Sequence, residues 1–138
     1  MGSSADQIIA VVDDDEGVCR SVRNLFLSLE FAVEVFGSAE VFLQSGRLED
    51  TACLILDLRM PGMSGLDLLH ALSATGSKVP TIVLTAHGDA DTRVSCLQAG
   101  ALEVLQKPFD TGVLAQSVKT IMGSAHGRSG NPSSGPDF

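Results

Sequence analysis

The sequence predicts an α/β fold, a doubly wound sheet of five parallel strands with helices on both faces. Short apolar segments alternate with segments of helical periodicity five times along the chain, which is the pattern of a parallel sheet. Two of the apolar segments, residues 53–56 and 81–84, are unbroken, as expected for strands buried on both faces. Right-handed crossovers, and the acidic residues after the first and third strands, favour the strand order 2-1-3-4-5.

A single domain accounts for the length of 138 residues, which is enough to enclose a substantial hydrophobic core. Hydrophobic residues make up 44% of the chain and charged residues 19%, as in ordinary globular domains. We assign the domain to residues 7–122 and expect residues 1–6 to be disordered. Residues 123–138 are rich in Gly, Ser and Pro, so we expect a flexible tail or linker there.

Charge, hydropathy and cysteine spacing exclude several functions. A net charge of −8 argues against direct nucleic-acid binding by this chain, because phosphate contacts need clustered Lys and Arg. No apolar segment is long enough to span a membrane, and the first residues lack a signal-peptide pattern, so we expect a cytoplasmic location and no membrane partner. Cys19, Cys53 and Cys96 have no metal-site or disulfide spacing and are expected to be buried thiols.

Five apolar segments are the expected strands. They are residues 8–12, 31–36, 53–56, 81–84 and 102–106. The last segment is more polar than the others, so we expect it at an edge of the sheet. Pro61, Gly62 and Gly65 make the segment after the third strand a turn-rich loop.

A helix is expected after each strand, and a residue that can cap free backbone N–H groups indicates where several of them begin. Ser38 can cap a short second helix and Asp110 can cap the last one. Ser64 and Asp67 have the spacing of a capping box at the start of the third helix. Asp15 lies near the start of the first helix, where the helix dipole favours negative charge.

Apolar residues at helical spacing indicate which faces of these helices pack on the sheet. In the first and last helices they are Val18, Val22, Leu25, Phe26 and Leu29, and Leu114, Val118, Ile121 and Met122. The fourth helix, residues 90–99, is only weakly amphipathic, through Val94 and Leu97.

Polar residues that could carry chemistry follow four of the five expected strands. They are Asp13, Asp14, Asp57, Thr85 and Lys107. Each taken alone has a simpler explanation, because acids often lie in solvated loops, threonine forms turns and lysine is usually on the surface. The carboxyl ends of parallel strands, however, meet at one edge of the sheet, where ligands bind. Five such residues at one edge predict a functional site.

Three carboxylates in a partly buried cleft repel one another unless a cation joins them. A hard divalent ion satisfies this need, and Mg²⁺ suits a site with few carboxylates; Mn²⁺ can substitute for it. Asp57, directly after an apolar strand, could then act as a nucleophile that forms an aspartyl phosphate. Lys107 would supply positive charge and Thr85 a hydroxyl donor to the phosphoryl oxygens, while the small Ala86 leaves the approach open.

These residues lie in segments that resemble the receiver domains of bacterial two-component response regulators. The resemblance covers about residues 6–122 and is carried by residues 11–14, 56–65, 84–86 and 107–109. The stretches Asp-Leu-Arg-Met-Pro and Thr-Ala-His-Gly-Asp are most similar to receivers of nitrogen-fixation-type regulators, usually joined to a DNA-binding helix-turn-helix. The resemblance implies a flavodoxin-like receiver fold with strand order 2-1-3-4-5.

The resemblance also implies how the acidic residues work. Asp57 would be the phosphoacceptor and would take its phosphoryl group from a phosphohistidine on a sensor histidine kinase or a histidine phosphotransfer protein. Asp14, Asp57 and the backbone carbonyl of Arg59 would bind Mg²⁺ directly, and Asp13 would act through water. Such a protein is a phosphoacceptor with self-phosphorylation and self-dephosphorylation chemistry rather than an enzyme.

The resemblance also implies how phosphorylation would be signalled to the rest of the domain. Thr85 and Lys107 would contact the phosphoryl group, and their rearrangement would switch the face made by the fourth helix, the fifth strand and the fifth helix. The bond between Lys107 and Pro108 is typically cis in the family. A homodimer formed on phosphorylation through the fourth and fifth helices is a further expectation.

The sequence departs from the family pattern at one position and has unusual residues at two others. The switch aromatic, three residues before the lysine, is Val104 here, and the chain has no Tyr or Trp. An aromatic side chain that turns inward behind Thr85 is therefore not available at that position. Arg59 and His87 occupy the positions that tune phosphoryl lifetime in the family, where they would contact the phosphoryl group, obstruct water or face solvent.

Three other functions compete with this interpretation. A phosphohydrolase with an aspartyl nucleophile needs a second acid two residues later, and Arg59 stands there. A nucleotide- or flavin-binding module needs a glycine-rich first loop, whereas residues 13–16 are all acidic. An interaction module that no longer accepts a phosphoryl group would keep the fold, and Val104 keeps this alternative open.

The sequence also leaves open which signalling output the domain controls. The tail could be a linker to a DNA-binding domain, which would make transcription regulation the output. A stand-alone or hybrid-kinase receiver would act in a phosphorelay instead.

Overall fold

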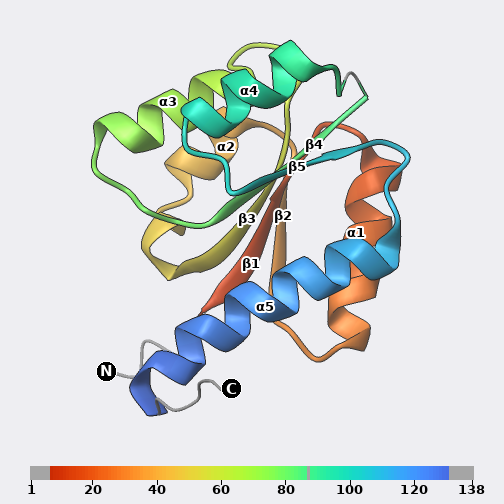
Figure 1. Ribbon diagram of the computed structural model, residues 1–138, viewed down its shortest axis with the longest axis vertical. Coiled ribbons are helices and arrows are strands. Elements are labelled where there is room, and N and C mark those ends of the chain that lie inside the picture. Colours follow the sequence, from red (N-terminus) through yellow and green to blue (C-terminus); the bar gives the residue numbers. More distant parts are fainter. Residues whose placement is uncertain (1–6, 87, 131–138) are drawn as a thin grey trace.

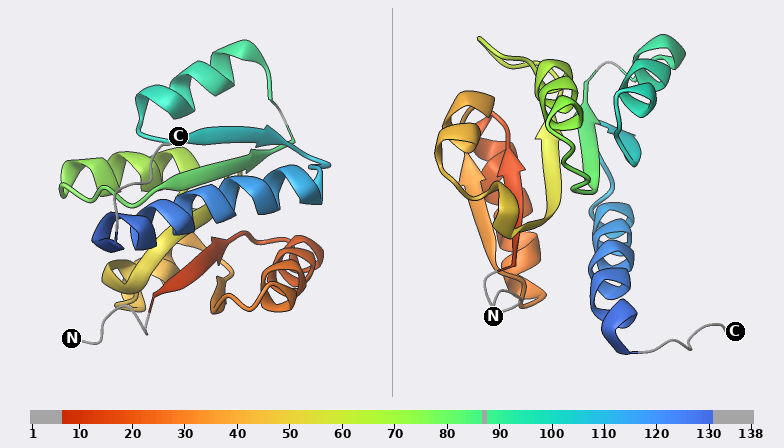
Figure 2. Two further views of the ribbon diagram at one scale, coloured as in Figure 1. Left: turned by 60° about the horizontal axis from the view of Figure 1, so that its bottom comes forward. Right: turned by 90° about the vertical axis from the view of Figure 1, so that its left-hand side faces the viewer.

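The computed structural model describes residues 7–86 and 88–130, except the side chains of residues 124–130. One sheet of five parallel strands has the order β2-β1-β3-β4-β5, which confirms the predicted order. The strands are β1 (Ile8–Val12), β2 (Val33–Phe36), β3 (Thr51–Asp57), β4 (Thr81–Thr85) and β5 (Glu103–Gln106). The right-hand view of Figure 2 shows them side by side, from β2 at one edge to β5 at the other.

Helices cover both faces of the sheet, as the sequence predicts. They are α1 (Glu16–Ser28), α2 (Ala39–Gln44), α3 (Gly65–Ala74), α4 (Ala90–Gln98) and α5 (Thr111–Gly130), and a short 3-10 helix, η2 (Leu48–Asp50), precedes β3. Helices α1 and α5 lie on one side of the sheet, and α2, α3 and α4 lie on the other (Figure 1). Within the two described ranges, no helix has the length and hydropathy needed to cross a membrane.

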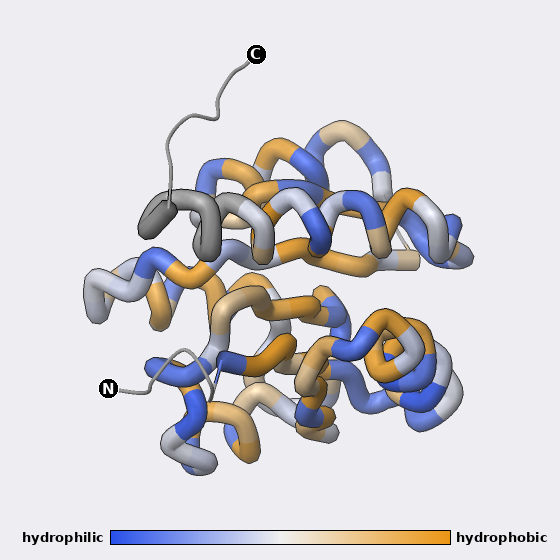
Figure 3. Tube along the Cα trace, turned by 90° about the horizontal axis from the view of Figure 1, so that it is seen from below, coloured by the Kyte–Doolittle hydropathy of each residue, from blue (hydrophilic) through white to orange (hydrophobic). Residues whose placement is uncertain are grey.

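Side chains of each central strand alternate between two hydrophobic layers. The layer under α1 and α5 includes Ile9, Val11, Cys53 and Ile55. The layer under α2, α3 and α4 includes Ala10, Val12, Leu54 and Leu56. Because both faces are covered, every residue of β1, β3 and β4 is buried, which explains the unbroken apolar segments in the sequence. Figure 3 shows hydrophobic residues running along the strands at the centre of the molecule.

Side-chain caps fix the beginnings of the helices, and those predicted at Ser38, Ser64 and Asp110 are confirmed. Asp15 accepts from the N–H groups of Gly17 and Val18 at the start of α1. The other caps are Ser38, the Ser64–Asp67 capping box, Asp89 and Asp110. Each cap places a helix start next to the carboxyl end of the preceding strand, where the predicted site lies.

Two strands begin later than predicted. Strand β2 begins at Val33 because the chain first turns through Glu30, whose φ is +69°, and the N–H of Phe31 closes α1 by donating to Phe26. Phe31 also packs edge-on against the Phe26 ring, so it belongs to the end of α1. Strand β5 begins at Glu103 rather than Leu102, and it is an edge strand as predicted.

The contact face of α4 differs from the prediction. Val94 and Leu97 are 49% and 43% exposed, whereas Cys96 is fully buried and Ala99, the C-cap, is 6% exposed. The expectation that the larger apolar residues face the core was wrong, because the smaller side chains of Cys96 and Ala99 occupy the buried face of α4. The larger residues are left on the surface.

Helix α5 packs through Leu114, Val118, Ile121 and Met122, as predicted, and then continues. It reaches Gly130, past Met122, the predicted end of the domain. A helix can propagate past a predicted boundary because each added residue gains a backbone hydrogen bond. A domain boundary at 122 and a linker after it stay predictions, and residues 1–6 and 131–138 lie outside the described part of the chain.

The three cysteines are free and buried, as expected. Burial raises the pKa of the Cys53 thiol to about 12. Burial, followed by the negative charges of Asp13 and Asp15, raises the pKa of Cys19 to about 11. Both thiols therefore stay protonated at neutral pH.

We predict that replacing Gly65 by alanine destabilises the protein by about 1–3 kcal/mol, the usual cost of overpacking. A Cβ at this first residue of α3 would collide with the backbone carbonyl oxygen of Asp57 and with Cα of Leu58, which cannot move like a side chain. Urea-induced unfolding measures the change.

Gly123→Ala is the matched control, since a Cβ there would meet nothing within 4 Å. This exposed helical position should gain about 0.5–1 kcal/mol from better helix propensity. A Gly65→Ala protein as stable as the wild type would contradict the proposed close approach of α3 to the end of β3.

Candidate functional site

The fold brings the predicted site residues to one edge of the sheet. Asp13 directly follows β1, Asp57 ends β3, Thr85 ends β4 and Lys107 directly follows β5. These strand ends lie together because all the strands are parallel. Asp13, Asp57 and Thr85 are buried, with 1%, 6% and 1% of their surfaces exposed.

Lys107 joins the two buried acids. Its Nζ donates to Oδ2 of Asp13 and to Oδ1 of Asp57, each at 3.0 Å. Its backbone N–H donates to the carbonyl oxygen of Thr85 at 2.7 Å, which fixes the chain as it leaves β5. The side chain thus reaches from the edge strand across the ends of β4 and β3 to Asp13 after β1.

Negative charge exceeds positive charge at this edge. Asp13, Asp14 and Asp57 each offer a carboxylate oxygen, and these oxygens lie within 4.8 Å of one another. Burial raises the pKa of Asp57, the Lys107 hydrogen bond partly offsets this, and the charges of Asp13 and Asp14 raise it further. Burial lowers the pKa of Lys107, but its bonds to the two carboxylates outweigh this and leave the pKa above its usual value.

The surroundings hold Asp13 in place and leave Asp14 accessible. Oδ1 of Asp13 accepts the Asp15 N–H at 2.9 Å, and its backbone carbonyl accepts from the Cys19 thiol at 3.1 Å. Asp14 is exposed, so the acidic cluster opens to solvent on its side.

Three oxygen ligands with excess negative charge are a donor set that fits a hard divalent cation such as Mg²⁺. Two of the carboxylates are buried and share a single lysine, so a further cation would lower the electrostatic energy of the site. The residues present therefore fit the predicted metal.

The flanking residues differ in how the structure places them. Arg59 is exposed and lines a groove of about 330 Å³ between the β3–α3 loop and α4. Ala86 is exposed, and the Lys107–Pro108 bond is cis, as the resemblance implies. Val104 is 1% exposed and belongs to the layer under α4. His87 lies outside the described residues.

Two residues near the site were not predicted from the sequence. The Cys19 thiol contacts the Asp13 backbone, and a carboxylate oxygen of Glu40 in α2 accepts the Met63 N–H of the β3–α3 loop at 2.8 Å. Glu40 and Met63 are 23 residues apart, so no local spacing could reveal their contact. The Ser38 cap, which places Glu40 in the first turn of α2, was the one available signal.

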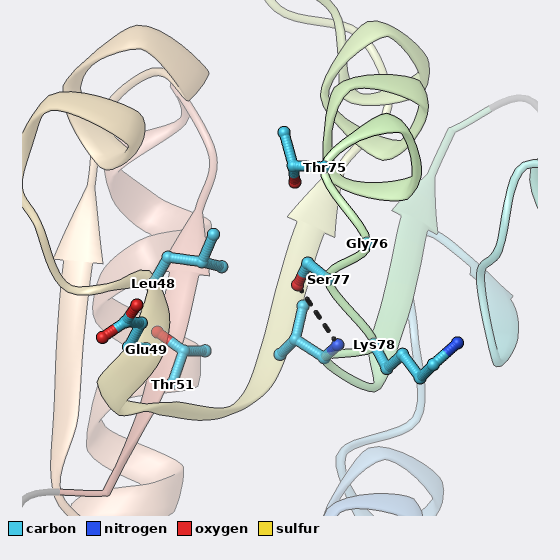
Figure 4. Close-up of a pocket in the computed structure, with 8 residues that line it drawn as sticks. Leu48, Glu49, Thr51, Thr75, Gly76, Ser77 and Lys78 are labelled. Carbon is cyan, nitrogen blue, oxygen red and sulfur yellow. Dashed lines mark hydrogen bonds between the residues drawn. The ribbon is translucent and has the colours of Figure 1, made fainter.

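A second groove, of about 490 Å³, lies at the opposite end of the sheet, between the start of β3 and the loop before β4 (Figure 4). Thr51 and Glu49 line one side and Gly76, Ser77 and Lys78 line the other. The groove contains none of the predicted site residues. Ligands of open parallel sheets bind at the carboxyl ends of the strands, so this groove is not the functional site.

Comparison with known proteins agrees with this geometry. Residues 9–119 match the model of the response regulator receiver domain family. The chain is 40% identical over 115 residues to the transcriptional regulatory protein FixJ of Azorhizobium caulinodans, and 41% identical over 116 residues to nodulation protein W of Bradyrhizobium diazoefficiens. These matches cover 83% and 84% of this chain, but 54% and 51% of the relatives. The chain thus spans about half the length of these curated relatives.

Solved structures show the same similarity. A low-resolution structure of the response regulator StyR has a TM-score of 0.79 and 41% identity, and the match covers 89% of this chain and 63% of that one. The crystal structure of FixJ-N has a TM-score of 0.74 and 36% identity, with 83% and 92% covered. The chain belongs to the response regulator receiver domains of two-component systems.

The electrostatics of the site predict that Asp57→Asn stabilises the protein at neutral pH in the absence of divalent cations. The pKa of Asp57 is raised in the folded state, so its ionisation disfavours folding as the pH rises from its usual pKa through the folded one. Asparagine keeps an oxygen for Lys107 and removes a charge. The gain should be about 1 kcal/mol, at the low end of what replacing a buried charged group by a neutral one gives.

Urea unfolding of both proteins between pH 3 and pH 8 tests this, with Asp91→Asn, an exposed acid on α4, as the control. The Asp57→Asn advantage should vanish at the acidic end, where wild-type Asp57 is protonated. An Asp57→Asn protein that is less stable than the wild type at pH 7 would contradict a net cost of burying the Asp57 charge beside Asp13 and Asp14.

Proposed function

We propose that this receiver domain accepts a phosphoryl group on Asp57 from a phosphohistidine, in a reaction that depends on Mg²⁺. The donor is a sensor histidine kinase or a histidine phosphotransfer protein. The supporting observation is the shared ion pair of Lys107, which holds a buried Asp57 within an acidic cluster at the carboxyl edge of the sheet.

The transfer uses the ionised carboxylate of Asp57 as nucleophile. One of its oxygens bonds to phosphorus while the bond between phosphorus and the histidine nitrogen breaks, and that nitrogen keeps the electron pair. Lys107, already 3.0 Å from Asp57, stays beside the negative charge that the phosphoryl group brings. Thr85 follows Leu84, the residue paired with Asp57 in the sheet, and its hydroxyl supplies a further donor.

Asp14, Asp57 and the backbone carbonyl of Arg59 would hold the metal directly, with Asp13 acting through water, and Mn²⁺ can replace Mg²⁺. When bound, the ion supplies positive charge that offsets the oxygens of the transferring group. The exposed position of Asp14 leaves a route into the site from solvent.

The protein acts on itself rather than on a separate substrate. Small phosphodonors would phosphorylate it and water would release the group, with no further catalytic acid required. Arg59 stands where a phosphohydrolase would carry its second acid, and a guanidinium does not transfer protons at neutral pH. These observations favour a phosphoacceptor over an aspartyl phosphohydrolase.

Output would pass to the face formed by α4, β5 and α5. Thr85 precedes the loop to α4, and Lys107 precedes α5. Four apolar side chains near these elements are exposed: Val94, Leu97, Leu102 and Val113. With Val104 in place of an aromatic residue, the loop after Thr85 would carry the change to α4 without an aromatic rotamer switch.

In the cytoplasm, the output would be transcription regulation through a further domain, as the names of the longer relatives suggest, or passage of the phosphoryl group along a phosphorelay. The acidic chain itself would not bind nucleic acid.

Incubation with Mg²⁺ and acetyl phosphate should give one phosphoryl adduct per chain, measured by intact-mass spectrometry. The adduct should disappear in Asp57→Asn and without divalent cation, and it should persist in the Asp91→Asn control. Phosphoramidate, whose phosphorus–nitrogen bond imitates phosphohistidine, should give the same adduct. A folded wild-type protein that reacts with neither donor would contradict the proposed chemistry.

Phosphorylation should also promote a homodimer through the exposed apolar residues of α4. Sedimentation velocity with Mg²⁺ and beryllofluoride, which imitates the phosphoryl group, should show a dimer that Leu97→Asp abolishes. Val41→Asp, at an exposed apolar residue of α2, is the matched control and should still dimerise. Identical sedimentation with and without beryllofluoride would rule out this output.

A further inference from the structure

The β3–α3 loop, residues 58–64, connects the phosphoacceptor to the next helix and includes Arg59. Its ends are held locally: the N–H of Gly65 donates to the carbonyl oxygen of Leu58 at 2.9 Å, and Ser64 belongs to the capping box of α3. Met60 is 8% exposed and packs in the layer under α2, α3 and α4. The Met63 side chain also packs against this layer, so it is the course of the backbone between Met60 and Ser64 that needs a further contact.

Glu40 of α2 supplies a contact to that segment. One of its carboxylate oxygens, Oε2, accepts the N–H of Met63 at 2.8 Å. This bond holds the pKa of Glu40 below its usual range, with the charge on the acceptor. A hydrogen bond to an ionised acceptor is stronger than a neutral one.

The loop is shaped to receive this carboxylate. Gly62 has a φ of +75°, which L-residues with side chains rarely adopt. A Cβ on Gly62 would lie 2.7 Å from Oε2 of Glu40. The glycine therefore serves both the turn and the approach of the carboxylate to Met63.

The backbone of Glu40 is held in place by the packing and capping of α2. Its neighbours on the helix, Ala39 and Phe42, are fully buried, and the Phe42 ring packs edge-on against Phe36 at the end of β2. The Ser38 cap fixes the start of the helix by accepting the N–H of Val41 at 3.1 Å. Glu40 thus links the loop to the end of β2, where the carbonyl oxygen of Phe36 accepts the N–H of Asp13 at 3.1 Å.

We propose that Glu40 is a positioning residue for the metal site: through Met63 it fixes the loop backbone that presents the Arg59 carbonyl beside Asp57. This inference rests on the proposed function, in which that carbonyl binds Mg²⁺. Residues that orient metal ligands typically change metal affinity by about 10–100-fold when removed. Because Glu40 acts through the loop backbone, we expect the lower end, about tenfold weaker Mg²⁺ binding.

Three variants test the proposal. Glu40→Ala removes the acceptor, Glu40→Gln keeps a neutral oxygen acceptor, and Glu49→Ala removes an exposed glutamate at the opposite edge of the sheet as a control. Mg²⁺ titrations followed by the amide NMR signals of Leu58 and Gly65 give the dissociation constants. Amide hydrogen exchange at Met63 and urea unfolding, both without Mg²⁺, report the hydrogen bond and the global stability.

Glu40→Ala should bind Mg²⁺ about tenfold more weakly and exchange its Met63 amide faster. Glu40→Gln should recover part of the affinity, because its neutral oxygen accepts a weaker hydrogen bond. Glu49→Ala should match the wild type. A Glu40→Ala protein that loses stability but binds Mg²⁺ normally would overturn the proposal and leave the proposed function intact. If Glu40→Gln binds Mg²⁺ as weakly as Glu40→Ala does, the role of the hydrogen bond to Met63 is overturned. A wild-type protein that binds no Mg²⁺ would instead contradict the proposed metal site, and the positioning role with it.

Discussion

The ammonium group of Lys107, shared between the buried carboxylates of Asp13 and Asp57, is the interaction on which the site depends. Two buried acids side by side would repel each other strongly without it. The lysine comes from the end of the edge strand and the acids from two central strands, so the contact forms only when β1, β3, β4 and β5 are aligned. The fold therefore supplies the geometry, and the ion pair couples the first acidic loop to the last strand.

One lysine does not balance three acids, and this imbalance suits the proposed chemistry. Because the site has less positive than negative charge, binding of a divalent cation would lower its electrostatic energy. The raised pKa of Asp57 reflects how weakly water stabilises the charge of its carboxylate there. A poorly solvated carboxylate that stays next to a fixed ammonium is well placed to attack phosphorus. The β3–α3 loop, bound by Glu40 and closed by Gly65, would provide the backbone side of the proposed metal site.

The strand order, most of the helix caps and the positions of the site residues could be predicted from the sequence because they depend on local patterns and on the rules of parallel sheets. Asp57 and Lys107 are 50 residues apart, yet both follow recognisable strands, so their proximity followed from topology. The contact face of α4 was predicted wrongly, since Cys96 and Ala99 pack where larger residues were expected. The Glu40–Met63 bond could not be predicted, because it depends on how a helix and a loop meet in space.

A crystal structure of the protein with Mg²⁺ and beryllofluoride would test the central claim most directly. The account predicts beryllium bonded to a carboxylate oxygen of Asp57, with the Lys107 ammonium and the Thr85 hydroxyl on its fluorides. It also predicts the metal on Asp14, Asp57 and the Arg59 carbonyl. Beryllofluoride bound elsewhere, or an unmodified Asp57 still paired with Lys107 in a folded protein, would contradict it.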